Sequence, residues 1–277
     1  MKKYFISLVS VFIIVVLFTS CELFKMDNYD EPTETLRGDI VDVATGERIQ
    51  TDQTGNGIRI RLRELSWKQS EVPGNFDILC MKEGNYQNTK LFKGYYNVRA
   101  DGPFIPLVRL NQRGDTIADE SKNIDIKGGV TELNFEVQPF LKVEWVGNPV
   151  INKDSTITVG IRVTRAVSPE VFRAKIEPMG AYNNNFLEVS DIRLFVNQVA
   201  YVGLSQYDSR YSLVSTAYDY AGNSFEPLLG QTITLKTIGK IPPGRTLFIR
   251  AAARIRYTTE AVSRYNYNEA KRVDIPR

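Results

Sequence analysis

The side chains best suited to hold a ligand gather between residues 182 and 223, where tyrosines are mixed with amides, carboxylates and arginine. A flat aromatic ring can cover the apolar face of a sugar while its polar neighbours hydrogen-bond the hydroxyls. The candidate ligand-binding residues are Tyr182, Tyr207, Tyr211, Tyr218, Tyr220, Asp208, Asp219, Asn223 and, from an earlier polar loop, Trp67. The tyrosines could instead plug the ends of a β-sandwich. Both interpretations stay open, and binding of an oligosaccharide or polysaccharide is the hypothesis to test.

The sequence contains few residues suited to catalysis or metal binding. The chain contains no histidine, which removes Ser-His-Asp and Cys-His catalysis and His-ligated zinc. Two carboxylates could still hydrolyse a glycosidic bond, but no compact acidic motif is present. Asp208, Asp219 and Asn223 offer the hard oxygen ligands that calcium prefers, without a recognised calcium-loop spacing. We therefore predict no enzyme activity, no cofactor and no metal site.

The first 21 residues have the pattern of an export signal. Lys2 and Lys3 precede an apolar run over residues 4–18, which is too short to cross a bilayer. The end of this run, Phe18-Thr19-Ser20-Cys21, resembles a bacterial lipobox, in which the cysteine is lipidated. We expect a signal peptide over residues 1–20, membrane attachment through lipid on Cys21, and an acidic tether over residues 21–35. The alternative is an ordinary signal peptide with a chance cysteine.

The balance of charge argues against nucleic acid as a partner. The chain has 35 basic and 32 acidic residues, and loss of Lys2 and Lys3 with the signal peptide leaves it close to neutral. Arg59, Arg61 and Arg63 form a basic stripe on alternate residues. We interpret this stripe as a solvated face with cross-strand carboxylates, although it could instead dock a partner or an acidic glycan.

The chain after the tether is predicted to be all-β. Residues 58–63 alternate apolar and basic side chains, which is typical of a strand with one buried face. Further short apolar runs, including residues 171–176 and 200–204, are separated by Gly, Pro, Asn and Asp. We predict two β-sandwich domains over residues 36–139 and 140–277, with long loops over residues 205–229. Cys80 has no partner once Cys21 is lipidated, so we expect a buried, unreactive thiol.

Residues 36–49, with the sequence LRGDIVDVATGERI, resemble the first strand and turn of carboxypeptidase-regulatory-like domains, which are prealbumin-like sandwiches. Gly46 supplies the positive φ that such a turn needs. Residues 241–253 are similar to the penultimate strand of fibronectin type III-like domains, which implies an Ig-like fold for the second domain.

Residues 88–98 and 137–143, taken with the lipobox and the tether, are similar to an uncharacterised family of two-domain Bacteroidetes outer-membrane lipoproteins. Members accompany SusC/SusD-type glycan-uptake systems, in the position of SusE- or SusF-like proteins. The resemblance implies a cell-surface, glycan-binding accessory protein with SusC/SusD-type partners. Attachment on the periplasmic face is the fallback for its location. The alternative function is a structural or assembly subunit of the uptake complex that binds no sugar.

Overall fold

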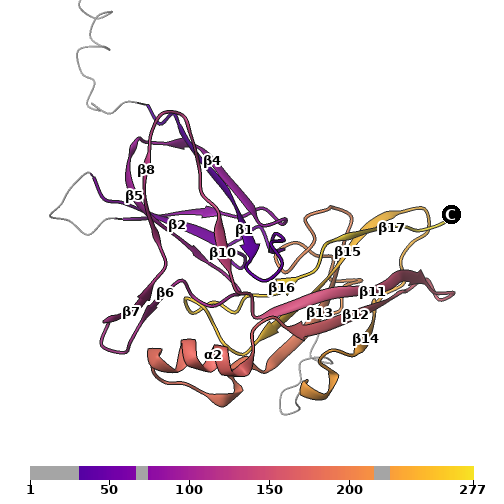
Figure 1. Ribbon diagram of the computed structural model, residues 1–277. Helices are drawn as coiled ribbons and strands as arrows, with labels where there is room; N and C mark the ends of the chain where they lie inside the picture. Colours follow the sequence, from indigo (N-terminus) through magenta and orange to yellow (C-terminus); the bar gives the residue numbers. More distant parts are fainter. Residues whose placement is uncertain (1–30, 67–73, 215–224) are drawn as a thin grey trace, which may run out of the picture. The chain divides into compact units, whose positions relative to one another are not determined.

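The protein is all-β, as predicted, in a computed structural model that describes residues 31–66, 74–214 and 225–277 (Figure 1). The strands are β1 (Glu34–Asp42), β2 (Arg59–Glu64), β3 (Asn75–Leu79), β4 (Asn85–Leu91), β5 (Gly94–Asp101), β6 (Val108–Leu110), β7 (Thr116–Asp119), β8 (Lys122–Ile126), β9 (Val130–Glu132), β10 (Phe135–Val137), β11 (Leu141–Ile151), β12 (Ile157–Arg165), β13 (Val189–Asn197), β14 (Thr232–Lys236), β15 (Thr246–Ile255), β16 (Asn266–Tyr267) and β17 (Lys271–Asp274). The helices are α2 (Pro169–Ile176) and the 3-10 turns η1 (Glu177–Met179), η2 (Asn184–Leu187) and η4 (Glu226–Leu228).

Residues Thr33–Arg277 form one compact unit. The expected signal peptide and Cys21 lie outside the described residues. β1 already begins at Glu34, so the last two residues of the expected tether are strand. None of the helices in the described ranges has the length and hydrophobicity that crossing a bilayer requires.

Strands β1–β5 and β8–β10 build a sandwich of two sheets. One sheet has the order β10-β1-β4, with β9 also pairing β1, and the other has the order β3-β2-β5-β8. Alternate residues of each strand point between the sheets, so that Leu36 and Ile40 of β1 and Ile60 of β2 are completely buried. The β6–β7 hairpin forms a separate two-stranded ribbon (Figure 1).

The outward face of β2 confirms that the basic stripe meets carboxylates on neighbouring strands. Arg61 Nε donates to Asp77 Oδ1 of β3 over 2.8 Å, and Arg59 Nε lies 3.3 Å from Asp101 Oδ2 of β5. Hydrogen bonding from Arg61 lowers the pKa of Asp77. These two arginines are therefore largely neutralised by residues of their own sheet.

Cys80, directly after β3, is a free and buried cysteine, as expected. Burial raises the pKa of its thiol well above the usual range, which keeps it in the weakly nucleophilic protonated form. The side chain contributes to the apolar core between the two sheets.

Strands β11–β17 build a second sandwich. Its sheets have the orders β11-β12-β14 and β13-β15-β16, and β17 pairs the first half of β15. The inward residues of β15, among them Ile249 and Ala251, lie in the core. The outward residues Arg250 and Ala252 are also buried, because residues 198–214 and loops of the first sandwich cover this face of the sheet. β15 thus has partners on both faces.

Two expected strands are wrong. Residues 171–176 belong to helix α2, whose N-cap Ser168 accepts a hydrogen bond from Val171 N and is followed by Pro169 at the first helical position. Phe172 and Ile176, four residues apart, place both bulky side chains on the buried helix face. Residues 200–204 form turns, even though they are rich in apolar side chains.

The two sandwiches meet around the buried side chain of Arg250. Its Nη1 donates to Thr51 O over 2.8 Å and its Nη2 donates to Lys82 O over 3.1 Å, so two loops of the first sandwich are tied to β15. The same guanidinium lies 4.5 Å from the ring centroid of Tyr267. This contact holds the first and second sandwiches together as a single unit.

A second contact between the sandwiches involves Glu260. Its carboxylate lies 2.9 Å from Arg99 Nη2, 3.3 Å from Arg59 Nη2 and 3.6 Å from Arg61 Nη1. Glu260 and its neighbour Ala261 have φ values of 52° and 58°, a conformation that is unusual for residues with a side chain. The turn therefore presents the carboxylate to the arginines of β2 and β5.

Candidate functional site

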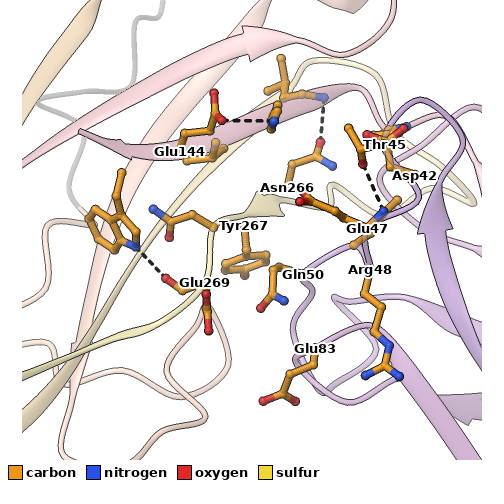
Figure 2. Close-up of a pocket in the computed structure, with 17 residues that line it drawn as sticks. Asp42, Thr45, Glu47, Arg48, Gln50, Glu83, Glu144, Asn266, Tyr267 and Glu269 are labelled. Atoms are coloured by element: carbon orange, nitrogen blue, oxygen red, sulfur yellow. Dashed lines mark hydrogen bonds and ion pairs between the residues drawn. The ribbon is translucent and has the colours of Figure 1, made fainter. Parts of the chain in front are cut away.

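A pocket of about 760 Å³ opens beside this junction, with walls from both sandwiches (Figure 2). The first sandwich contributes Asp42 at the end of β1, the turn residues 45–50 and Glu83. The second contributes residues 141–145 of β11, β16 and the two residues that follow it. The Arg250 bonds to Thr51 and Lys82 fix the backbone next to the lining residues Gln50 and Glu83.

Four lining residues of the second sandwich are apolar or aromatic. They are Leu141, Val143 and the half-buried Trp145 on β11 and Tyr267 on β16. Trp145 Nε1 donates to Glu269 O over 2.8 Å, and Lys271 Nζ lies 5.4 Å from the indole centroid. The hydrogen bond to Glu269, in the segment after β16, therefore holds the indole of β11 in one orientation.

Eight lining residues, from both sandwiches, carry a carboxylate or an amide. The acidic lining residues are Asp42, Glu47, Glu83, Glu144 and Glu269, and the amide residues are Gln50, Asn266 and Asn268. Figure 2 shows Glu47, Gln50 and Glu83 on the side of the first sandwich and Glu144 and Glu269 on the side of the second. Aromatic and apolar side chains together with several hydrogen-bonding groups are the usual composition of a small-molecule site.

Two asparagines of the lining differ in how their amides are used. Asn266 Oδ1 accepts from Leu141 N over 3.2 Å, and its Nδ2 donates to Pro103 O over 3.1 Å. Asn268 Oδ1 accepts from Ala251 N over 2.9 Å. The Nδ2 of Asn268 is buried without an acceptor among the described residues. A buried amide donor is costly to leave unpaired.

A solved structure of a DUF3823 family protein from Bacteroides uniformis is 49% identical in sequence, with a TM-score of 0.81, over 88% of this chain and all of the other. The chain belongs to the DUF3823 family. A DUF3823 protein from Parabacteroides merdae is 17% identical with a TM-score of 0.57, over 88% of this chain and all of the other. No family model and no curated protein matches the sequence.

A further similar structure is a candidate carbohydrate-binding protein from Bacteroides uniformis. It is 20% identical with a TM-score of 0.61, over 88% of this chain and all of that protein. At this identity the likeness shows a shared fold. The comparisons therefore confirm that this DUF3823 protein belongs to an uncharacterised family with Bacteroides members, as the sequence resemblance predicted.

Five of the nine predicted ligand-binding residues lie outside the described residues. They are Trp67, Tyr218, Asp219, Tyr220 and Asn223. The other four predicted residues, Tyr182, Tyr207, Tyr211 and Asp208, are described and lie outside the pocket lining.

Tyr182 and Tyr207 lie near opposite ends of β13. The ring of Tyr182 contacts Phe172 and Phe186, and Phe186 O accepts from Tyr257 N beside the start of β13. The ring of Tyr207 contacts Phe195 near the end of β13. A nine-residue strand spans about 25 Å, so the two tyrosines do not form one surface.

Tyr207 is the most exposed of the four described residues, at 36%. Tyr211 is buried in the second core with the Arg210 guanidinium 5.1 Å from its ring centroid, so its ring has little surface for a ligand. The hydrogen bonds from Arg210 lower the pKa of the Asp208 carboxyl. Tyr201, six positions before Tyr207 in the sequence, is 60% exposed. It was not among the ligand-binding residues predicted from the sequence.

The pocket was missed because its residues come from four separate stretches of the chain, residues 42–50, Glu83, residues 139–145 and residues 266–269. The local signal that could have pointed to it is the run Tyr265-Asn266-Tyr267-Asn268-Glu269, where aromatic and amide side chains alternate. Within the described ranges, no group of three or more acidic or cysteine side chains is arranged to hold a metal ion.

Proposed function

We propose that this DUF3823 protein binds a glycan in the pocket between its two sandwiches and serves as an accessory component of a SusC/SusD-type uptake system. The observation that carries the proposal is the indole of Trp145, held by its bond to Glu269, in a pocket whose lining also carries amides and carboxylates. Aromatic rings pack on the apolar faces of sugars, and carboxylates and amides bond the hydroxyls. The fold shared with a candidate carbohydrate-binding protein supports the same function.

The pocket has the size and access that a short oligosaccharide needs. About 760 Å³ lies within the range of small-molecule sites, roughly 300 to 1,000 Å³. Glu47 and Glu269 are exposed while Asn266 and Asn268 are buried, so hydrogen-bonding groups occur at both the rim and the floor. A segment of a longer polysaccharide would enter across this rim.

Affinity electrophoresis of residues 33–277 through gels with different polysaccharides tests the site. We expect one or more polymers to retard the protein and Trp145→Ala to weaken retention at least about tenfold, because loss of the indole removes the main apolar contact. Trp145→Phe, which keeps an aromatic ring, is expected to retain part of the binding. A urea unfolding curve for each variant separates lost binding from lost folding.

Tyr201→Ala and Tyr207→Ala are the matched controls, since both residues are exposed aromatics outside the pocket. Loss of retention in Tyr207→Ala with full retention in Trp145→Ala would move the site to the loop predicted from the sequence. Free migration of the wild-type protein in every gel would leave the non-binding assembly subunit as the better explanation.

The anchor at Cys21 and the location on the cell surface belong to the same proposal. The lipobox resemblance and the acidic tether support them. We expect the wild-type chain to incorporate a labelled fatty acid in cells and Cys21→Ala to incorporate none. Protease added to intact cells should degrade the anchored protein. Survival of the protein until the outer membrane is permeabilised would indicate the periplasmic face instead.

A further inference from the structure

The chain enters the first sandwich at the end that lies away from the second sandwich. Thr51 and Lys82, which bond Arg250 of β15, lie beyond the opposite ends of the strands. Figure 1 shows the described chain starting at the top of the first sandwich, away from β11–β17. We call the end where β1 begins the entry end, and it consists of residues 33–35, 91–94 and 126–130.

The strand register brings two segments together at the entry end. Leu91, the last residue of β4, pairs with Glu34, and Val130, the first residue of β9, pairs with Thr35. Because β4 and β9 lie on opposite sides of β1, the two segments are about 10 Å apart, which is two strand spacings. Side chains from both segments can therefore contact the same surface.

Two large apolar side chains are exposed at the entry end. Phe92 is 47% exposed and Val130 is 56% exposed. Their neighbours Leu91 and Ile126 are buried in the core of the first sandwich, which fixes both segments to the sheets. The exposed pair is therefore presented by a rigid part of the molecule.

The charges on and next to the entry end are balanced. The basic residues are Lys90, Lys93 and Lys127, and the acidic residues are Glu31, Glu34 and Asp125. Lys127 Nζ lies 3.5 Å from Asp125 Oδ2, and Glu34 Oε2 accepts from Gly129 N over 2.7 Å. A surface that meets the entry end would therefore be held by apolar contact and not by net charge.

The length of chain before β1 limits how far the entry end can lie from a membrane. Cys21 lies 13 positions before Glu34. An extended chain of that length spans at most about 45 Å, and a flexible one averages roughly 20 Å. Lipid on Cys21, which is part of the proposed function, would therefore tie the entry end to the bilayer.

We propose that the entry end rests on the lipid surface that anchors Cys21, with Phe92 and Val130 inserted at the boundary of headgroups and acyl chains. The inference rests on the proposed anchor and adds the protein surface that contacts the lipid. Apolar side chains at such a boundary reach roughly 5 to 10 Å into it. The tether keeps the entry end close to the lipid, so a small apolar contact is enough to orient the protein.

This contact would also place the pocket. Asp42, the last residue of β1, lines the pocket, whereas Glu34 begins the same strand at the entry end. A nine-residue strand spans about 25 Å. The pocket would therefore be held about that distance from the lipid, at the end of the first sandwich that points away from the membrane.

Chemical coupling to vesicles tests the contact without the lipidation pathway of the cell. Residues 21–277 contain two cysteines, of which Cys80 is buried, so Cys21 couples selectively to a maleimide lipid in phosphatidylcholine vesicles. Phe92→Trp is introduced into a chain whose two native tryptophans are replaced by phenylalanine, and acyl-brominated phosphatidylcholine is the quencher. We expect the emission to fall by at least about half, because the indole would lie at the acyl boundary. Added salt should leave the quenching unchanged.

Matched variants in the same tryptophan-free background control the measurement. Tyr201→Trp places the indole at an exposed aromatic position of the second sandwich, and its emission should not respond to brominated lipid. Val130→Asp, added to Phe92→Trp, should restore most of the emission, because a charge is costly to bury at the boundary. Val199→Asp, at an exposed valine of the second sandwich, should restore none. Far-UV circular dichroism checks that each variant is folded.

Each outcome supports or overturns the contact. Unquenched Phe92→Trp on vesicles that carry the coupled protein would overturn it. Equal quenching of Phe92→Trp and Tyr201→Trp would show that neither end faces the lipid, which also overturns it. Both results leave glycan binding and lipidation in cells untouched. A wild-type chain that takes up no fatty acid in cells would remove the proposed anchor, and this inference with it.

Discussion

Replacing Arg250 by methionine is expected to cost roughly 3 to 5 kcal/mol of unfolding free energy, the range seen when one partner of a buried charged network is removed. Burial lowers the pKa of Arg250 to about 10, so the guanidinium is still charged at neutral pH. It donates to the backbone carbonyls of Asn268, Thr51 and Lys82. Methionine fills a similar volume and leaves these buried acceptors without a donor.

The effect of Arg250→Met should extend beyond stability. Thr51 and Lys82 belong to the first sandwich, whereas Asn268 follows β16 and lines the pocket. Loss of the guanidinium should therefore loosen the junction, and unfolding could proceed in two steps instead of one. Urea unfolding followed by the fluorescence of Trp67 and Trp145, one in each predicted domain, would detect separate transitions.

Two controls define the result. Arg250→Lys keeps the charge and loses the fork of donors, so an intermediate loss of stability is expected. Arg37→Met removes an exposed arginine that pairs with Glu132, and such surface pairs contribute roughly 1 kcal/mol or less. An Arg250→Met protein within about 1 kcal/mol of wild type would contradict the assigned role.

Replacing Phe172 by alanine is expected to cost roughly 3 to 5 kcal/mol, as for other fully buried phenylalanines. Phe172 is 0% exposed, and its ring packs edge-to-face on Phe140 at 5.8 Å and on Tyr257 at 5.6 Å between centroids. Alanine would leave a cavity between α2 and the second core, since the surrounding rings are held by one another. The midpoint of urea unfolding is the measurement.

The neighbours of Phe172 distinguish a helix from the strand that the sequence suggested. Val171 is 39% exposed and Ala174 is also exposed, so Val171→Ala and Ala174→Glu should change stability by about 0.5 kcal/mol or less. In a strand, residue 174 would share the inward face with Phe172 and Ile176. A large loss in Ala174→Glu would therefore contradict helix α2.

The helix shows where sequence patterns are weakest. Val171, Phe172 and Ile176 have high strand propensity, and six residues are too few for periodicity to separate the two structures. The deciding signal was Ser168-Pro169-Glu170, an N-cap followed by proline and an acidic residue in the first turn. Local capping chemistry outweighed the propensity of the residues that follow.

Strict alternation of apolar and basic residues predicted secondary structure correctly. Arg59, Ile60, Arg61 and Leu62 form β2 with the apolar pair buried and the basic pair facing outward, because successive side chains of a strand point to opposite faces. Gly46 adopts φ of 72° in the turn after β1, as expected. These features depend on residues a few positions apart in the sequence. They can therefore be predicted without knowledge of the tertiary structure.

The sequence by itself determined the all-β class, the inward and outward faces of β2, the Gly46 turn and the lack of histidine chemistry. Only the tertiary structure decided that Glu47, Trp145 and Asn268 share a pocket, since residues about a hundred positions apart meet through packing of two sandwiches. It also decided that Arg250, on the outward face of β15, is buried. That arginine has the polarity of a surface residue, and it becomes interior because the first sandwich supplies carbonyls that its guanidinium needs.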